Sequence, residues 1–219
     1  MRARPTATIA IVALCFGTVN ASAAVGRAPA RVQIEDAAND ANGLNNQSLQ
    51  TVVPGFPDPE APRTANLNDQ ADLLKVWFTN DSKTISAHLQ TTAEPGPTSG
   101  LRFQVAAGRE EGSTATGCVF FDVVLPDGRM RTETEAWVFD FCGSDQTYSA
   151  IAEVSSFADG TGHITITADR RTSASFGKGM VIERPIANSR AFFLWVGPVN
   201  YAPHLLDLTE EGSPYRIRG

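Results

Sequence analysis

The sequence predicts an all-β protein, an antiparallel two-sheet β-sandwich. About nine short segments alternate apolar and polar residues with a period of two, and turn residues such as Gly, Pro, Asn and Asp separate them. No segment has the longer periodicity of a sustained amphipathic helix. Strands this short bury their apolar faces by packing one sheet on another.

The clearest strand pattern is a hairpin over residues 72–90, with its turn predicted at Asp81 and Ser82. With that centre, one face carries apolar pairs and the other carries mostly polar ones. The apolar pairs are Phe78 with Ile85, Val76 with Ala87 and Leu74 with Leu89, and the other face pairs Lys75 with His88 and Trp77 with Ser86.

The later strands follow in order. They are expected at residues 101–105, 118–125, 130–142, 148–154, 163–168, 180–186, 191–196 and 215–217, with a short helix or loop at 169–178. Segment 118–125 is apolar on both faces, which is typical of a central strand. Three aromatic residues of 130–142 share one parity and are expected in the core together with Trp195, Phe192 and Phe193; they are Trp137, Phe139 and Phe141.

The N-terminus predicts secretion. Residues 1–23 combine two early arginines, a short apolar run and small residues before the expected cut after Ala23, as in a signal peptide. The apolar run is too short to cross a bilayer. A lipoprotein signal at Cys15 is disfavoured because Leu14 precedes it where a small residue is needed. Residues 24–66 then predict an extended Asn/Asp- and Pro-rich arm, and residues 67–219 the sandwich domain.

Two cysteines remain after the signal, Cys118 and Cys142, and in an exported protein they predict a disulfide. The alternative is two separate buried thiols. The chain has 18 basic and 24 acidic residues, and loss of the two signal arginines leaves 16 against 24, a net charge of −8. This balance argues against nucleic acid and anionic membranes as partners and is compatible with cation binding.

Oxygen-bearing side chains predict a calcium site formed by Asp36, Asp40, Asn42 and Asp72. The spacing is not that of an EF-hand, because Ala38 and Leu49 stand at two ligand positions. The alternative is an Asx-rich turn whose side chains bond their own backbone.

Trp77, Lys75 and His88 form the predicted ligand-binding surface on the outer face of the hairpin. An exposed aromatic ring there could stack on a sugar ring or on a partner protein. The alternative is that the Pro-rich arm, with Phe56, covers Trp77.

No catalytic pattern stands out. The three histidines lack metal-ligand spacing, and neither a nucleophile elbow nor a phosphate-binding glycine loop occurs. We therefore expect a protein that is not an enzyme. A haem site is disfavoured because no Met and His pair is suitably placed.

The pattern Asp36-x-x-x-Asp40-x-Asn42, followed by Ala71-Asp72-Leu73 and the apolar alternation of residues 76–89, resembles the DOMON-like β-sandwich modules, a group that includes the family 9 carbohydrate-binding modules. Asn39 stands where that pattern favours glycine. The resemblance implies a two-sheet, jelly-roll-like sandwich without catalysis and, in some members, a site for sugar, haem or calcium. We therefore expect a secreted module that binds an extracellular ligand such as carbohydrate. The alternative is a structural or protein-assembly module of the cell envelope, and the sequence leaves the oligomeric state open.

Overall fold

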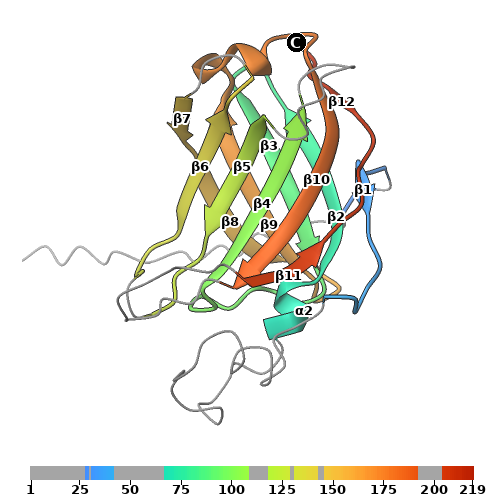
Figure 1. Ribbon diagram of the computed structural model, residues 1–219, viewed down its shortest axis with the longest axis vertical. Helices are drawn as coiled ribbons and strands as arrows, with labels where there is room; N and C mark the ends of the chain where they lie inside the picture. Colours follow the sequence, from blue (N-terminus) through green and yellow to red (C-terminus); the bar gives the residue numbers. More distant parts are fainter. Residues whose placement is uncertain are drawn as a thin grey trace, which may run out of the picture.

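The computed structural model describes residues 28–29, 31–41, 67–108, 118–128, 131–142, 146–191 and 204–219. Their strands form two sheets that pack face to face, and every strand pair is antiparallel (Figure 1). The predicted all-β, two-sheet sandwich is therefore confirmed. Within the described part of the chain, no helix has both the length and the apolar character needed to span a bilayer.

The first sheet has five strands. In spatial order they are β1 (Ile34–Glu35), β2 (Leu73–Asn80), β3 (Thr84–Thr91), β9 (Gly162–Asp169) and β8 (Ile151–Ser156). Strand β1 belongs to the segment that the sequence predicts as an arm, and it adds to the edge of β2.

The second sheet has seven strands. Its main order is β11 (His204–Leu208), β10 (Val181–Ala191), β4 (Leu101–Gly108), β5 (Val119–Val124), β6 (Glu135–Asp140) and β7 (Gln146–Ser149), and β12 (Tyr215–Arg216) also pairs with β10. Strand β5 lies between β4 and β6, as its apolar faces predicted. In the described part of the chain the helical elements are short: α2 (Leu67–Ala71) and two 3₁₀ turns, η1 (Arg170–Thr172) and η2 (Ala174–Phe176).

The predicted hairpin forms, but its predicted register is wrong by two residues. Val76 pairs with Leu89, Trp77 with His88 and Phe78 with Ala87. The turn is centred one residue later than expected because the Asp81 carboxylate accepts the backbone N–H groups of Lys83 and Thr84, both at 2.7 Å. A shift of two residues keeps every side chain on its face. A register irregularity between Leu73 and Lys75 then makes Leu73, rather than Leu74, the buried residue at the start of β2.

The predicted strand at residues 148–154 is two strands in different sheets. Strand β7 ends at Ser149 beside β6, and β8 begins at Ile151 beside β9. The chain crosses between the sheets at Ala150, whose N–H donates to the carbonyl of Ala136 at 3.1 Å. Tyr148, Ala152 and Val154 all lie on the inner side of their sheets, so the alternation of inner and outer residues continues through the crossing. The alternation alone therefore could not reveal that the chain changes sheets.

The inner faces of both sheets form one apolar core. Its largest fully buried side chains include Phe103, Phe121, Phe176, Ile85, Leu89, Ile164 and Ile166. The segment predicted as short helix or loop forms η1 and η2, and η2 places Phe176 against Phe121 with ring centroids 5.7 Å apart. Residues 192–196 of the predicted strand 191–196 lie outside the described residues.

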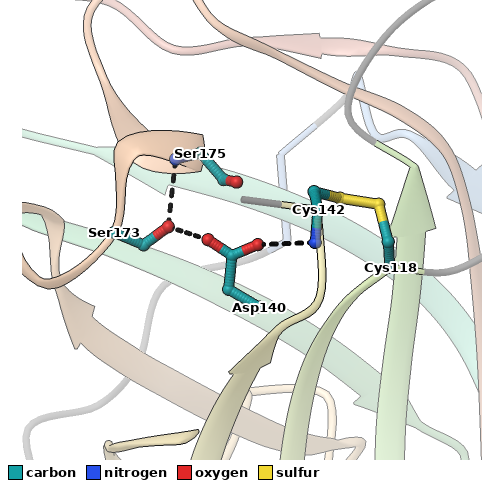
Figure 2. Close-up of a disulfide and its surroundings, with 5 residues drawn as sticks. All are labelled: Cys118, Asp140, Cys142, Ser173 and Ser175. Atoms are coloured by element: carbon teal, nitrogen blue, oxygen red, sulfur yellow. Dashed lines mark hydrogen bonds between the residues drawn. A yellow bond between two sulfur atoms is a disulfide. The ribbon is translucent and has the colours of Figure 1, made fainter. Parts of the chain in front are cut away.

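The predicted disulfide is confirmed. Cys118, just before β5, is bonded to Cys142, just after β6, with Cα atoms 5.0 Å apart. Figure 2 shows that the fully buried carboxylate of Asp140 lies beside this bridge and accepts the backbone N–H of Cys142 at 3.0 Å. Its other oxygen accepts the hydroxyl of Ser173, which in turn accepts the N–H of Ser175 at 3.0 Å. The bridge and this network tie the end of β6 to η2.

Candidate functional site

Trp77 leaves the five-stranded sheet on its outer face, as predicted, but its side chain is covered. Only 6% of the residue is exposed. The indole is stacked on the rings of His88 and His163, with centroids 5.1 and 5.4 Å away, and Phe157 packs at 6.2 Å. Trp77 therefore offers no bare ring for stacking. Phe56, the residue that would cover Trp77 in the alternative interpretation, lies outside the described residues.

The other two residues of the predicted binding surface are engaged with neighbours. Lys75 forms an ion pair with Glu35 of β1, with nitrogen and oxygen 3.7 Å apart. The Nε2 atom of half-buried His88 is 2.7 Å from the hydroxyl of Thr79, and its Nδ1 atom is 3.2 Å from Nε2 of His163. The structure brings Trp77 and His88 together and adds His163 and Phe157, which the sequence did not single out.

The two histidines, His163 buried and His88 half-buried, form an imidazole pair. Burial, and then the charge of His163, lower the pKa of His88 from 6.5 to about 4. Burial also lowers the pKa of His163, whose Nδ1 atom is buried without a hydrogen-bond partner. Both rings are therefore held neutral at physiological pH, in the form that stacks under Trp77.

The predicted acidic site is in part assembled. Ligand oxygens of Asp36, Asp40 and Asp207 all lie within 4.8 Å of one another. Asp207 belongs to β11 of the other sheet and comes from a strand that the sequence did not predict. The Asp36 Oδ2 atom is buried and has no hydrogen-bond partner.

The negative charges of Asp36, Asp40 and Asp207 are close together and partly buried, which makes their ionised forms less favourable. Burial, with the nearby charges of Asp36 and Asp40, raises the pKa of Asp207 to about 6, although it accepts the backbone N–H of Leu73 at 2.6 Å. Burial and the charges of Asp40 and Asp72 also raise the pKa of Asp36. No lysine or arginine of the described ranges forms an ion pair with any of the three.

The predicted calcium ligand Asp72 is not one of the three clustered carboxylates. Its buried carboxylate accepts the N–H groups of Asn39, Asp40 and Ala41, at 2.8, 3.3 and 3.2 Å, and the hydroxyl of Thr92. It therefore shapes the loop that presents Asp40. Asn39 adopts a φ of 67°, which asparagine tolerates almost as glycine does. Asn42 lies outside the described residues.

The outer face of the seven-stranded sheet carries an aromatic strip, formed by Phe120, Trp137, Phe139 and Phe141. Ring centroids are 6.4 Å apart for Trp137 and Phe139, 6.1 Å for Phe139 and Phe141, and 5.9 Å for Phe120 and Phe141. Phe141 is 53% exposed and the other three are half-buried.

The predicted core position of Trp137, Phe139 and Phe141 is therefore wrong. In the β5–β6 register Val138 pairs with buried Phe121, so Val138, Ala136 and Asp140 are the inner residues of β6. Trp137 and Phe139, which alternate with these inner residues, therefore lie on the outer face of the sheet. Trp195, Phe192 and Phe193 lie outside the described residues.

Beside the aromatic strip lies a polar ladder, formed by Arg190 and Asn188 of β10, Arg102 and Gln104 of β4, and Asp122 of β5. Arg190 Nε donates to Asn188 at 2.9 Å, Asn188 donates to Gln104 at 3.3 Å, and Gln104 donates to Asp122 at 3.0 Å. Arg102 also contacts the Asp122 carboxylate, with which its guanidinium forms an ion pair. Asp122 pairs in register with Trp137, so the ladder and the strip are continuous across the sheet.

No family model, curated protein or solved structure matches the chain. The resemblance to DOMON-like modules therefore stays a prediction, and the function is inferred from the geometry alone.

Proposed function

We propose that this protein is a secreted, non-catalytic module that binds carbohydrate on the outer face of its seven-stranded sheet. The observation that carries the proposal is the aromatic strip, in which Phe141 is exposed and the other three rings are half-buried, next to the polar ladder. The disulfide supports an oxidising compartment, where such bridges persist. The binding surface moves from the Trp77 face, where the ring is covered, to the opposite side of the sandwich.

The two parts of this face suit a sugar chain. Aromatic rings bury the apolar C–H face of a pyranose at a small entropic cost, and amide and guanidinium groups donate hydrogen bonds to hydroxyls. Trp137 and Phe141 are four residues apart, which corresponds to about 13 Å along an extended chain. The strip is therefore long enough for more than one sugar ring.

Glycan-array binding tests this proposal with two variants of the aromatic strip, Phe141→Ala and Trp137→Ala. Since Phe141 is 53% exposed, its loss should leave the fold intact. The matched control is Ile151→Ala, a change of a 69% exposed residue on the other sheet. We expect both strip variants to lose binding at least about tenfold and the control to keep it, on the scale of a lost aromatic contact. Equal binding by all three would refute the proposed surface.

We propose in addition that Asp36, Asp40 and Asp207 hold a calcium ion. The oxygens of these three carboxylates lie within 4.8 Å of one another and have no basic partner among the described residues, so their charges repel one another. The Asp36 Oδ2 atom has no hydrogen-bond partner and is free to coordinate a metal ion. Calcium takes six to eight oxygens at such sites, so backbone carbonyls and water would complete the shell.

Calorimetric titration with calcium after chelation tests this site. We expect heat of binding and a higher Tm for the protein, and neither for Asp207→Asn. Asp122→Asn is not a suitable control because it lies in the polar ladder; Asp127→Asn, at a turn on another part of the chain, serves instead. Absence of heat and of any Tm change in the protein itself would remove calcium.

The second candidate function is assembly in the cell envelope. Strand β7, with β6 on one side, is the last strand in the order of its sheet and lies beside the aromatic strip, so a further chain could pair there. Concentration-dependent association in light scattering that Phe141→Ser abolishes, together with no glycan binding, would favour this function over the first.

A further inference from the structure

We infer that the bound glycan is acidic, with carboxylate groups on its sugar rings as in polyuronates. This inference rests on the proposed function of the aromatic strip and adds a ligand class to it. It comes from the chemistry of the polar ladder.

The polar ladder is rich in donors and poor in acceptors. Two guanidinium groups and two primary amides supply the N–H groups, and only the Asp122 carboxylate and two amide oxygens accept. Each of these acceptors already receives at least one donor of the ladder. Asp122 receives Arg102 Nε at 2.7 Å and Gln104 at 3.0 Å, Gln104 receives Asn188, and Asn188 receives Arg190.

Burial separates the two kinds of group. The acceptor-bearing residues Asp122 and Asn188 are 0% and 5% exposed, whereas Arg102, Gln104 and Arg190 are half-buried. The groups within reach of a ligand on this face are therefore chiefly donors, and two of the three carry positive charge.

Arg190 carries the least compensated charge of the ladder. It pairs in register with Arg102, so two like charges lie opposite each other on neighbouring strands, an arrangement that costs stability. Asp122 compensates Arg102. In the described ranges Arg190 has no carboxylate partner, and its Nε donates to the neutral amide of Asn188. A ligand carboxylate would supply the missing anion through a bidentate contact to the guanidinium.

The distance between this cation and the aromatic strip fits a sugar chain that crosses the strands. β10 and β6 are three strands apart in the sheet, which corresponds to about 14 Å. The chain as a whole is acidic, with a net charge of −6, so long-range attraction does not favour an anion. Recognition of the acid must then be a short-range contact at Arg190.

Binding assays with a matched pair of ligands test the inference: oligogalacturonate and the same oligosaccharide with its carboxylates reduced to alcohols. The protein, Arg190→Gln and Lys83→Gln are compared. Glutamine at 190 keeps a donor for Asn188, and Lys83 is an exposed cation in the turn before β3, on the other sheet. We expect the acid form to bind at least about tenfold more tightly, Arg190→Gln to abolish that difference, and Lys83→Gln to keep it.

The outcomes separate the two proposals. Equal binding of acid and reduced forms, or an unchanged preference in Arg190→Gln, overturns the acidic ligand and leaves carbohydrate binding standing. Failure to bind either form, together with no signal on an array of neutral and acidic glycans, overturns both.

Discussion

Acidification should destabilise the fold through the imidazole pair under Trp77. The folded state lowers the pKa of His88 from 6.5 to about 4. At ~1.36 kcal/mol per unit this corresponds to about 3 kcal/mol. Because the folded pKa lies below the unfolded one, the unfolded chain takes up the proton first. The contribution of His88 to stability is therefore fully present above pH 6.5 and is lost as the pH falls from about 6.5 to about 4.

Asp207 acts in the opposite direction over nearly the same range. Its folded pKa of about 6 lies above the ordinary value of 3.8 for an aspartate, so it costs the fold about 3 kcal/mol at neutral pH. That cost is relieved as the pH falls from about 6 to 3.8. The two groups offset each other, and the stability of the protein alone would not isolate His88.

The difference between the protein and His88→Gln isolates it. Urea unfolding from pH 7.5 to pH 4 should show the variant less stable at neutral pH, because it loses the stack on Trp77. The difference between the two free energies of unfolding should then shrink by up to about 3 kcal/mol on the way to pH 4. A difference that stays constant across this window would refute the assignment of the buried, neutral imidazole.

Two further predictions concern the fold. Replacing Cys118 and Cys142 by alanine should lower the free energy of unfolding by about 3 kcal/mol, since the bridge closes a loop with a sequence separation of 24; equal stability of the double variant and the oxidised protein in urea would contradict this. Gly162→Ala should cost about 1–3 kcal/mol because the new Cβ would lie 2.6 Å from the carbonyl oxygen of Ala93. The control Gly96→Ala meets nothing closer than 3.6 Å and should unfold at nearly the same temperature as the protein, so equal Tm values for both variants would argue against the close approach.

The fold class could be predicted because local alternation encodes which face of a strand is buried. The hairpin at residues 72–90 shows the limit of that signal. A slip of two residues leaves the alternation unchanged. The register is instead set by the turn, in which the Asp81 carboxylate accepts the backbone N–H groups of Lys83 and Thr84. In the same way, alternation could not distinguish one strand from a crossing at Ala150, because both sheets present their inner faces to one core.

The candidate site was harder to predict because it depends on pairing between distant strands. Asp207 lies beside Asp36 and Asp40 only because β11 is placed there by the fold. Trp77 is covered in part by Phe157, which lies in the connection between β8 and β9. A usable signal existed for the aromatic strip. Phe120 lies on the outer face of segment 118–125, which predicts apolar neighbours for it on the next strand. Trp137, Phe139 and Phe141 share one face of that strand, and Phe139 pairs with Phe120.

The central claim is that a glycan meets the strip on the seven-stranded sheet and not the Trp77 face. NMR of the tryptophan indole N–H groups during oligogalacturonate titration tests it directly, with resonances assigned by Trp137→Phe and Trp77→Phe. We predict a shift of the Trp137 signal with a stationary Trp77 signal. A shift of Trp77 with a stationary Trp137 would contradict the account.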